Sequence, residues 1–202
     1  MSENWNLPNV LTTVRILLVP FFVWFLLAGG HAGEESPGLR WAAFAVFAVA
    51  MYTDKLDGDI ARSRGLVTSF GKIADPIADK FLTGAAFIVL SVLDELWWWV
   101  TVLILLREWG ITLMRFVVLR YGVMPASRGG KLKTVLQACA LLLMLAPLAP
   151  LVGDWYPWAG WAVMGAALVV TLVTGADYVL KAWRLRRSAL AGEAGRAGEV
   201  GA

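Results

Sequence analysis

Six apolar stretches run through the sequence, each close to the roughly 20 residues that a helix needs to cross a lipid bilayer. They lie at residues 10–29, 41–62, 72–93, 96–120, 132–152 and 158–183. Lipid offers no hydrogen-bond partner to a peptide group, so a single spanning segment of this length must bond within itself as a helix. The sequence therefore predicts an all-α, polytopic integral membrane protein with six transmembrane helices.

The composition agrees with a membrane domain. Of the 202 residues 59% are hydrophobic and 16% are charged, which is far more apolar than a typical soluble domain. The net charge of +3 is no nucleic-acid signal, because the basic residues follow the connections between apolar stretches and form no stripe of their own. We therefore predict membrane lipids and no nucleic acid as partners. The single Cys139 excludes a disulfide framework within the chain.

Charge predicts the orientation of these helices. Basic residues follow the second, fourth and sixth stretches: Arg62, Arg64, Lys72, Arg120, Arg128, Lys131, Lys133, Lys181, Arg184, Arg186 and Arg187. The other connections carry Glu34, Glu35, Arg40, Asp94, Glu95 and Asp154. The positive-inside rule then places both termini in the cytoplasm, and Trp97–99 with Trp155, Trp158 and Trp161 at the opposite interface. We expect residues 1–187 to form the membrane domain, and the tail at 188–202, rich in Gly, Ala and Glu, to be disordered.

Four carboxylates lie in and beside the second and third stretches, where a bilayer makes an uncompensated charge costly. Asp54 and Asp57 share one face of a helix, and Asp75 and Asp79 share a face of the next. Residues 54–79 contain no His or Cys, and oxygen ligands alone favour Mg²⁺ or Mn²⁺ over zinc. The pattern predicts a divalent-metal site at the cytoplasmic face.

The run D-x2-D-G-x2-A-R-x8-G-x3-D-x3-D, from Asp54 to Asp79, resembles the signature of the CDP-alcohol phosphatidyltransferases at every fixed position. The resemblance implies that an alcohol attacks the lipid-linked phosphorus of a CDP-alcohol and expels CMP, with two metal ions bound, in a homodimer. It implies that Asp54, Asp57 and Asp75 are the principal metal ligands and that Asp79 is a catalytic general base that can also touch the second metal. It further implies a CDP pocket formed by Asp57, Gly58, Ala61, Arg62 and Gly71.

A second group of charged residues suggests an acceptor site: Arg107, Arg115, Lys131 and Lys133. Intramembrane arginines need anionic partners, and two interpretations remain open. Either these residues bind the acceptor's phosphate, or Arg107 pairs with Glu108 or a motif aspartate and Arg115 with a carbonyl or a lipid phosphate. The two lysines are two residues apart and point to different helix faces, so we expect only one to reach the acceptor and favour Lys133.

The R-E-x6-R run from Arg107, the G-K-x-K-T-x2-Q run from Gly130 and the opening N-L-P-N-x-L-T resemble one branch of the family, the bacterial phosphatidylglycerophosphate synthases. The branch joins CDP-diacylglycerol to glycerol 3-phosphate, so the resemblance implies a protein of the bacterial cell membrane with its active site at the cytoplasmic face.

Two alternatives to this function stay open. One keeps the chemistry but uses inositol phosphate or phosphatidylglycerol as acceptor. The other is an ion transporter with intramembrane carboxylates, which is less favoured because the acids cluster at one interface and no internal repeat is evident.

Overall fold

The computed structural model describes residues 7–63, 69–118 and 128–200, with all regular structure in these ranges helical. Side chains are described except at residues 7–9, 55–63, 69–76, 115–118, 128–129, 185–186 and 188–200. The elements are α1 (Leu7–Gly29), η1 (His31–Gly33), α2 (Pro37–Ser63), α3 (Ser69–Val92), α4 (Trp98–Val118), α5 (Arg128–Leu145), α6 (Ala149–Val152) and α7 (Tyr156–Val200). The predicted all-α fold is confirmed.

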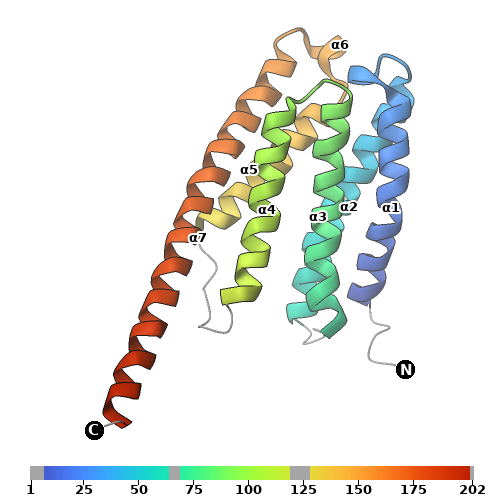
Figure 1. Cartoon of the computed structure of the whole chain (residues 1–202). Coiled ribbons are helices and arrows are strands. Elements are labelled where there is room, and N and C mark those ends of the chain that lie inside the picture. Colours follow the sequence, from blue (N-terminus) through green and yellow to red (C-terminus); the bar gives the residue numbers. More distant parts are fainter. Residues whose placement is uncertain (1–6, 64–68, 119–127, 201–202) are drawn as a thin grey trace.

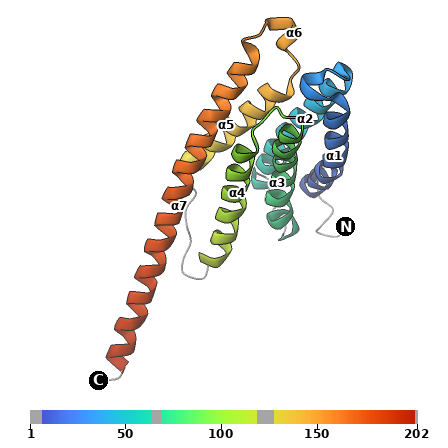
Figure 2. The ribbon, with the colours of Figure 1, turned by 45° about the horizontal axis from the view of Figure 1, so that its top comes forward.

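The long helices lie side by side as one bundle, with α5 crossing obliquely behind α4 (Figures 1 and 2). Helix α1 packs on α2 and α3, while α7 packs on α5 and α4. Helices α2 and α3 also contact α5, which ties the two groups together. The bundle therefore brings the acidic helices α2 and α3 close to α5, which carries the basic residues.

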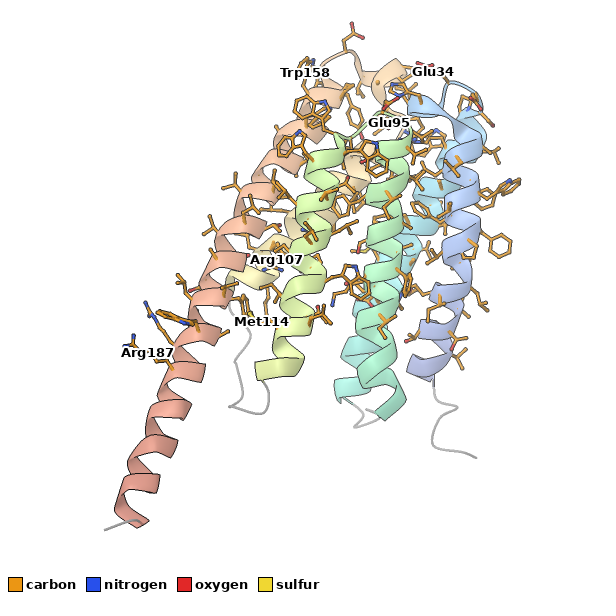
Figure 3. The ribbon with its side chains drawn as sticks, in the orientation of Figure 1. Glu34, Glu95, Arg107, Met114, Trp158 and Arg187 are labelled. Carbon is orange, nitrogen blue, oxygen red and sulfur yellow. The ribbon has the colours of Figure 1, made fainter. Side chains whose placement is uncertain are left out.

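The two ends of the bundle differ in character. The motif end holds the start of α1, the end of α2 and the start of α3, and the C-terminal part of α7 extends past it (Figure 1). The opposite end, which we call the tryptophan end, consists of residues 30–36, 93–99 and 146–158. Its exposed indoles include Trp97, Trp98, Trp99, Trp155 and Trp158. Figure 3 shows Trp158 at this end, which also carries the acidic Glu34 and Glu95.

One predicted stretch differs from the structure. The stretch predicted at 132–152 is broken: α5 ends at Leu145 and the short α6 starts at Ala149, because Pro147 and Pro150 each lack the amide that a continuous helix requires. The disordered tail predicted at residues 188–202 stays a prediction; helix α7 extends to Val200 in the structure. This segment contains Ala, Glu and Arg among its glycines, and these three residues have high helix propensity.

The core of the bundle is apolar and its outer faces are apolar too. Buried Phe22, Phe47, Leu82, Leu90 and Ile104 belong to one continuous core. Large apolar side chains also point outward along the helices, among them Leu17, Phe21, Val49, Leu106, Leu113, Val173 and Trp183. Two segments in the described part, Val10–Gly29 and Tyr156–Arg184, are long and apolar enough by themselves to cross a membrane.

A buried ion pair connects the helices and loops that form the tryptophan end. Arg40 in α2 is fully buried and donates from Nη1 and Nη2 to the two carboxylate oxygens of Glu95, at 2.8 and 2.6 Å. Its Nε donates to the carbonyl of Leu145 at 2.9 Å and Nη2 to that of Met144 at 2.8 Å. One guanidinium thus joins α2, the α3–α4 connection and the end of α5. It also donates hydrogen bonds to carbonyls in the last turn of α5, which have no amide partner in the described part of the chain because the helix ends before Pro147.

Candidate active site

The structure describes the side chains of only some of the signature residues. The side chains of Asp54 in α2 and Asp79 in α3 are described. Asp57, Gly58, Ala61 and Arg62 lie in α2, Gly71 and Asp75 in α3, and Arg115 in α4, but their side chains lie outside the described part. Helix α3 begins at Ser69, so both signature segments are helical and α2 contacts α3, as the spacing predicts.

Asp54 is paired with an arginine from another helix. Arg15 in α1 donates from Nη1 to Oδ1 of Asp54 at 2.6 Å and from Nε to the carbonyl of Ala50 at 3.3 Å. The Arg15 side chain is 1% exposed, whereas that of Asp54 is 36% exposed. The Asp54 side chain is therefore still partly accessible to solvent. Sequence reasoning assigned Arg15 no role in the site, although a single arginine inside an apolar stretch signals a buried partner.

Asp79 lies half-buried at the meeting point of several helices. The charged side chains whose fields reach its carboxylate are Lys133 of α5, Arg15 of α1, Glu108 of α4 and its neighbour Lys80. These residues are far apart in the sequence, and packing of α1, α3, α4 and α5 brings them together. The charge of Lys133, one of the basic residues predicted for the acceptor site, thus acts on the last signature carboxylate.

Lys80 itself turns away toward α4. Its Nζ donates a short hydrogen bond to Oγ1 of Thr112 and lies 5.8 Å from the ring centroid of Trp109. It therefore ties α3 to α4 on one side of Asp79.

A cluster of three charged side chains joins α4 to α5. Oε1 of Glu108 accepts hydrogen bonds from Nζ of Lys133 at 2.5 Å and from Nη1 of Arg107 at 3.1 Å. Lys133 is 7% exposed. Of the two interpretations that the sequence left open for Arg107, pairing with Glu108 is therefore present in the structure.

Arg107 is also fastened to α7. Its Nε donates to the carbonyl of Thr171 at 3.2 Å and its Nη2 to Oγ1 of Thr174 at 3.0 Å. Figure 3 shows the side chain between α4 and α7. Gln137 of α5 donates to Oγ1 of Thr171 at 3.0 Å, so the same point of α7 is held from two sides. Sequence reasoning assigned no role to Thr171 and Thr174, because neutral polar residues in helices carry little signal by themselves. Gln137 ends the G-K-x-K-T-x2-Q run, but its contact with α7 was not predicted.

The two candidate lysines of α5 face in different directions. Lys131 is exposed, whereas Lys133 is buried between Glu108 and Asp79. The expectation that the two point to different faces is confirmed. Of the four basic residues predicted for the acceptor site, the structure brings Arg107 and Lys133 together and leaves Lys131 outside the cluster.

The site has the composition that a divalent metal and phosphates require. The carboxylates of Asp54 and Asp79 contain oxygen atoms that can bind a metal, and residues 54–79 contain neither His nor Cys. These possible ligands therefore suit a hard cation. In the described side chains alone no group of three or more possible metal ligands is present, and Asp57 and Asp75 lie outside them.

Comparison with known proteins identifies the family. A family profile for CDP-alcohol phosphatidyltransferase matches residues 5–173. The chain is 51% identical to the "Probable phosphatidylglycerophosphate synthase" of Mycobacterium tuberculosis (strain H37Rv) over 179 residues, which cover 89% of this chain and 82% of the relative. It is 38% identical to the "CDP-diacylglycerol--glycerol-3-phosphate 3-phosphatidyltransferase" of Bacillus subtilis (strain 168), covering 89% and 96%. A "Cardiolipin synthase (CMP-forming)" of Streptomyces coelicolor is 29% identical, covering 93% and 87%. With its signature complete from Asp54 to Asp79, this chain belongs to the CDP-alcohol phosphatidyltransferase family.

Proposed function

We propose that this protein transfers the phosphatidyl group of CDP-diacylglycerol to glycerol 3-phosphate, forming phosphatidylglycerophosphate and releasing CMP. The observation that favours a phosphorylated acceptor is the buried position of Lys133, a cation whose charge acts on Asp79, the last signature carboxylate. The names of the relatives at 51% and 38% identity support the same pair of substrates.

The proposed placement is a six-span protein of the bacterial cell membrane, with both termini and the motif end in the cytoplasm. The apolar outer faces of the bundle and the indoles of the tryptophan end support this placement. In this arrangement α5 and α6 make the fifth crossing together, and the start of α1 and the end of α7 lie at the same end of the bundle (Figure 1). A homodimer, which the family resemblance implies, stays a prediction.

The proposed donor site consists of the signature residues. Asp54, Asp57 and Asp75, with Asp79 on the second ion, would hold Mg²⁺ or Mn²⁺, while Gly58, Ala61, Arg62 and Gly71 would line the CDP pocket with Asp57. When bound, the metal neutralises the diphosphate and favours departure of CMP. Arg15 contributes by compensating Asp54 from inside the bundle, which lowers the cost of gathering carboxylates here. The planar fork of Arg62 suits a diphosphate oxygen pair.

In the proposed reaction a hydroxyl of glycerol 3-phosphate attacks the phosphorus that carries diacylglycerol. A new P–O bond forms to the acceptor, the bridging P–O bond of the diphosphate breaks, and CMP takes the electron pair. The hydroxyl proton passes to a carboxylate oxygen of Asp79, which lies between the two substrate sides of the site. The protein's main tasks are thus alignment and charge compensation.

The proposed acceptor-phosphate site includes Lys133 and Arg115, with Arg107 at its edge. Lys133 faces the interior, and the exposed Lys131 is better suited to headgroups at the membrane surface. Three donor atoms of Arg107 are already bonded to Glu108, Thr171 and Thr174. Its remaining hydrogens can still reach a phosphate, but its main role here is to order the cluster.

The function is tested with purified protein in detergent and CDP-diacylglycerol as donor. CMP release is measured with glycerol 3-phosphate, inositol phosphate, phosphatidylglycerol or no acceptor, each with Mg²⁺, Mn²⁺ or excess chelator. We expect release that depends on metal and on glycerol 3-phosphate. If CMP is released faster with phosphatidylglycerol, the acceptor of a cardiolipin synthase, or with inositol phosphate, the proposed acceptor is wrong. The proposed phosphatidyl transfer would still hold. No CMP release with any acceptor would refute the function.

A further inference from the structure

We infer that Glu108 is a positioning residue for the acceptor's phosphate: it holds the Lys133 ammonium and the Arg107 guanidinium beside each other before the acceptor arrives. This inference rests on the function proposed above and adds a residue that the sequence pattern does not assign to binding. Glu108 itself touches neither substrate in this account; it acts through Lys133.

The geometry that carries the inference is a shared oxygen atom. Both the 2.5 Å bond from Lys133 and the 3.1 Å bond from Arg107 end on Oε1 of Glu108. Two cations would otherwise repel each other, and one carboxylate oxygen between them offsets that repulsion. The side chains of Arg107, Lys133 and Glu108 are 11%, 8% and 18% exposed, so water screens this attraction weakly.

Lys133 needs such an anchor more than an arginine would. A lysine ammonium is a compact charge on a flexible stem with three donors and many rotamers. Its field also reaches Asp79, so a second carboxylate competes for it. Within the described residues Glu108 is the hydrogen-bond partner of Lys133, and it takes one of the three donors. Glu108 therefore keeps the ammonium from turning to Asp79 and leaves two donors for a phosphate.

The anchor is itself fixed to the scaffold. Arg107 connects Glu108 to Thr171 and Thr174 of α7, and a Cβ at Gly175 would come within 3.1 Å of its Cγ. Helix α7 thus contacts Arg107, Arg107 contacts Glu108, and Glu108 contacts Lys133. Rigid support of this kind reduces the ordering cost when a charged ligand binds.

The test is steady-state kinetics of Glu108→Gln with each substrate varied in turn. Glutamine keeps the size and one acceptor oxygen but removes the charge. We expect the KM for glycerol 3-phosphate to rise by about tenfold, while the KM for CDP-diacylglycerol stays close to wild type. The thermal midpoint should fall, because two nearly buried cations lose their carboxylate, so both KM values are measured where the variant is folded. Glu108→Asp, which keeps the charge on a shorter stem, should restore part of the affinity. Asp177→Asn, which removes an exposed carboxylate paired with Lys181 at 2.7 Å, is the matched control and should change neither KM.

A double-mutant cycle with Lys133→Met separates positioning from other roles. If Glu108 acts through Lys133, Glu108→Gln should add little to the effect of Lys133→Met. Fully additive effects would overturn the inference, as would equal rises in both KM values. A lower KM for glycerol 3-phosphate in Glu108→Gln would show that Glu108 competes with the phosphate and does not prepare its site.

The inference can fail separately from the proposed function. If the wild-type protein does not use glycerol 3-phosphate, the function fails, and the inference is then tested with inorganic phosphate. Phosphate should raise the thermal midpoint of the wild type more than that of Glu108→Gln, with Asp177→Asn equal to wild type. An equal rise in all three proteins would overturn the inference.

Discussion

Arg15 and Asp54 form an ion pair of 2.6 Å across α1 and α2, with the arginine buried and the aspartate partly open. The pairing means that the first signature carboxylate is already compensated from inside the bundle. The Asp54 carboxylate stays partly exposed beside this arginine.

This relationship makes Asp54→Asn an informative variant. Asparagine keeps the volume and can still accept the hydrogen bond from Arg15, but it removes the charge that a metal requires. We expect transfer to be abolished, and likewise in Asp57→Asn and Asp75→Asn, while all three proteins still insert into the membrane and purify as a single species. CMP release and size-exclusion profiles are the measurements. Wild-type turnover in any of the three, or full activity in excess chelator, would contradict the metal proposal.

Asp79→Asn should separate chemistry from donor binding. If Asp79 takes the hydroxyl proton, the rate should fall by about 10²–10⁴-fold. Binding of CDP-diacylglycerol, measured by titration, should be largely retained. Donor binding as weak as in Asp54→Asn would instead identify Asp79 as chiefly a metal ligand.

The two lysines of α5 provide a matched pair. Lys133→Ala removes the buried ammonium, and loss of a charge-assisted contact should raise the KM for glycerol 3-phosphate by about 10- to 100-fold. Lys131→Ala removes an exposed ammonium two residues away and should leave this KM nearly unchanged. Both KM values are measured for each variant. Equal effects of the two substitutions would contradict the assignment of Lys133 as the acceptor contact.

Gly175 and Gly165 of α7 test the placement of Arg107. A Cβ at position 175 would lie 3.1 Å from Cγ and 3.3 Å from Nε of Arg107, whereas nothing lies within 4 Å of one at position 165. Gly175→Ala should displace Arg107 and raise the KM for glycerol 3-phosphate several-fold. Gly165→Ala should be neutral or stabilising by up to about 1 kcal/mol, because alanine favours the helix. An effect of the same size in both variants would point to altered helix propensity and not to Arg107.

The Arg40–Glu95 pair should govern stability and not catalysis. Glu95→Ala leaves a fully buried guanidinium without its carboxylate, which should lower the free energy of unfolding by about 3–5 kcal/mol. Glu34→Ala, at an exposed position of the same end, is the control and should have little effect. Thermal midpoints in detergent are compared, and kcat per folded molecule should stay unchanged because the pair lies at the tryptophan end. An intact thermal midpoint in Glu95→Ala would contradict this role.

Much of the architecture was predictable from local pattern. Long apolar stretches favour helices, and within the described residues the structure has helical segments in each of the six. The break after Leu145 was not predicted, although Pro147 and Pro150 contain the signal, because hydropathy alone does not register the missing amide. The signature from Asp54 to Asp79 identifies the family by itself, because its residue types and spacings are specified together.

By itself the sequence determined the helices, the family and the different faces of Lys131 and Lys133, since all of these follow from composition and helical period. Only the tertiary structure decided which charges meet: Arg15 with Asp54, Glu108 with Lys133, and Arg40 with Glu95. These partners are 25 to 55 residues apart in the chain and come from different helices or connections. The physical reason is that helical period fixes the face on which a side chain lies, whereas the partner it meets depends on how the helices pack.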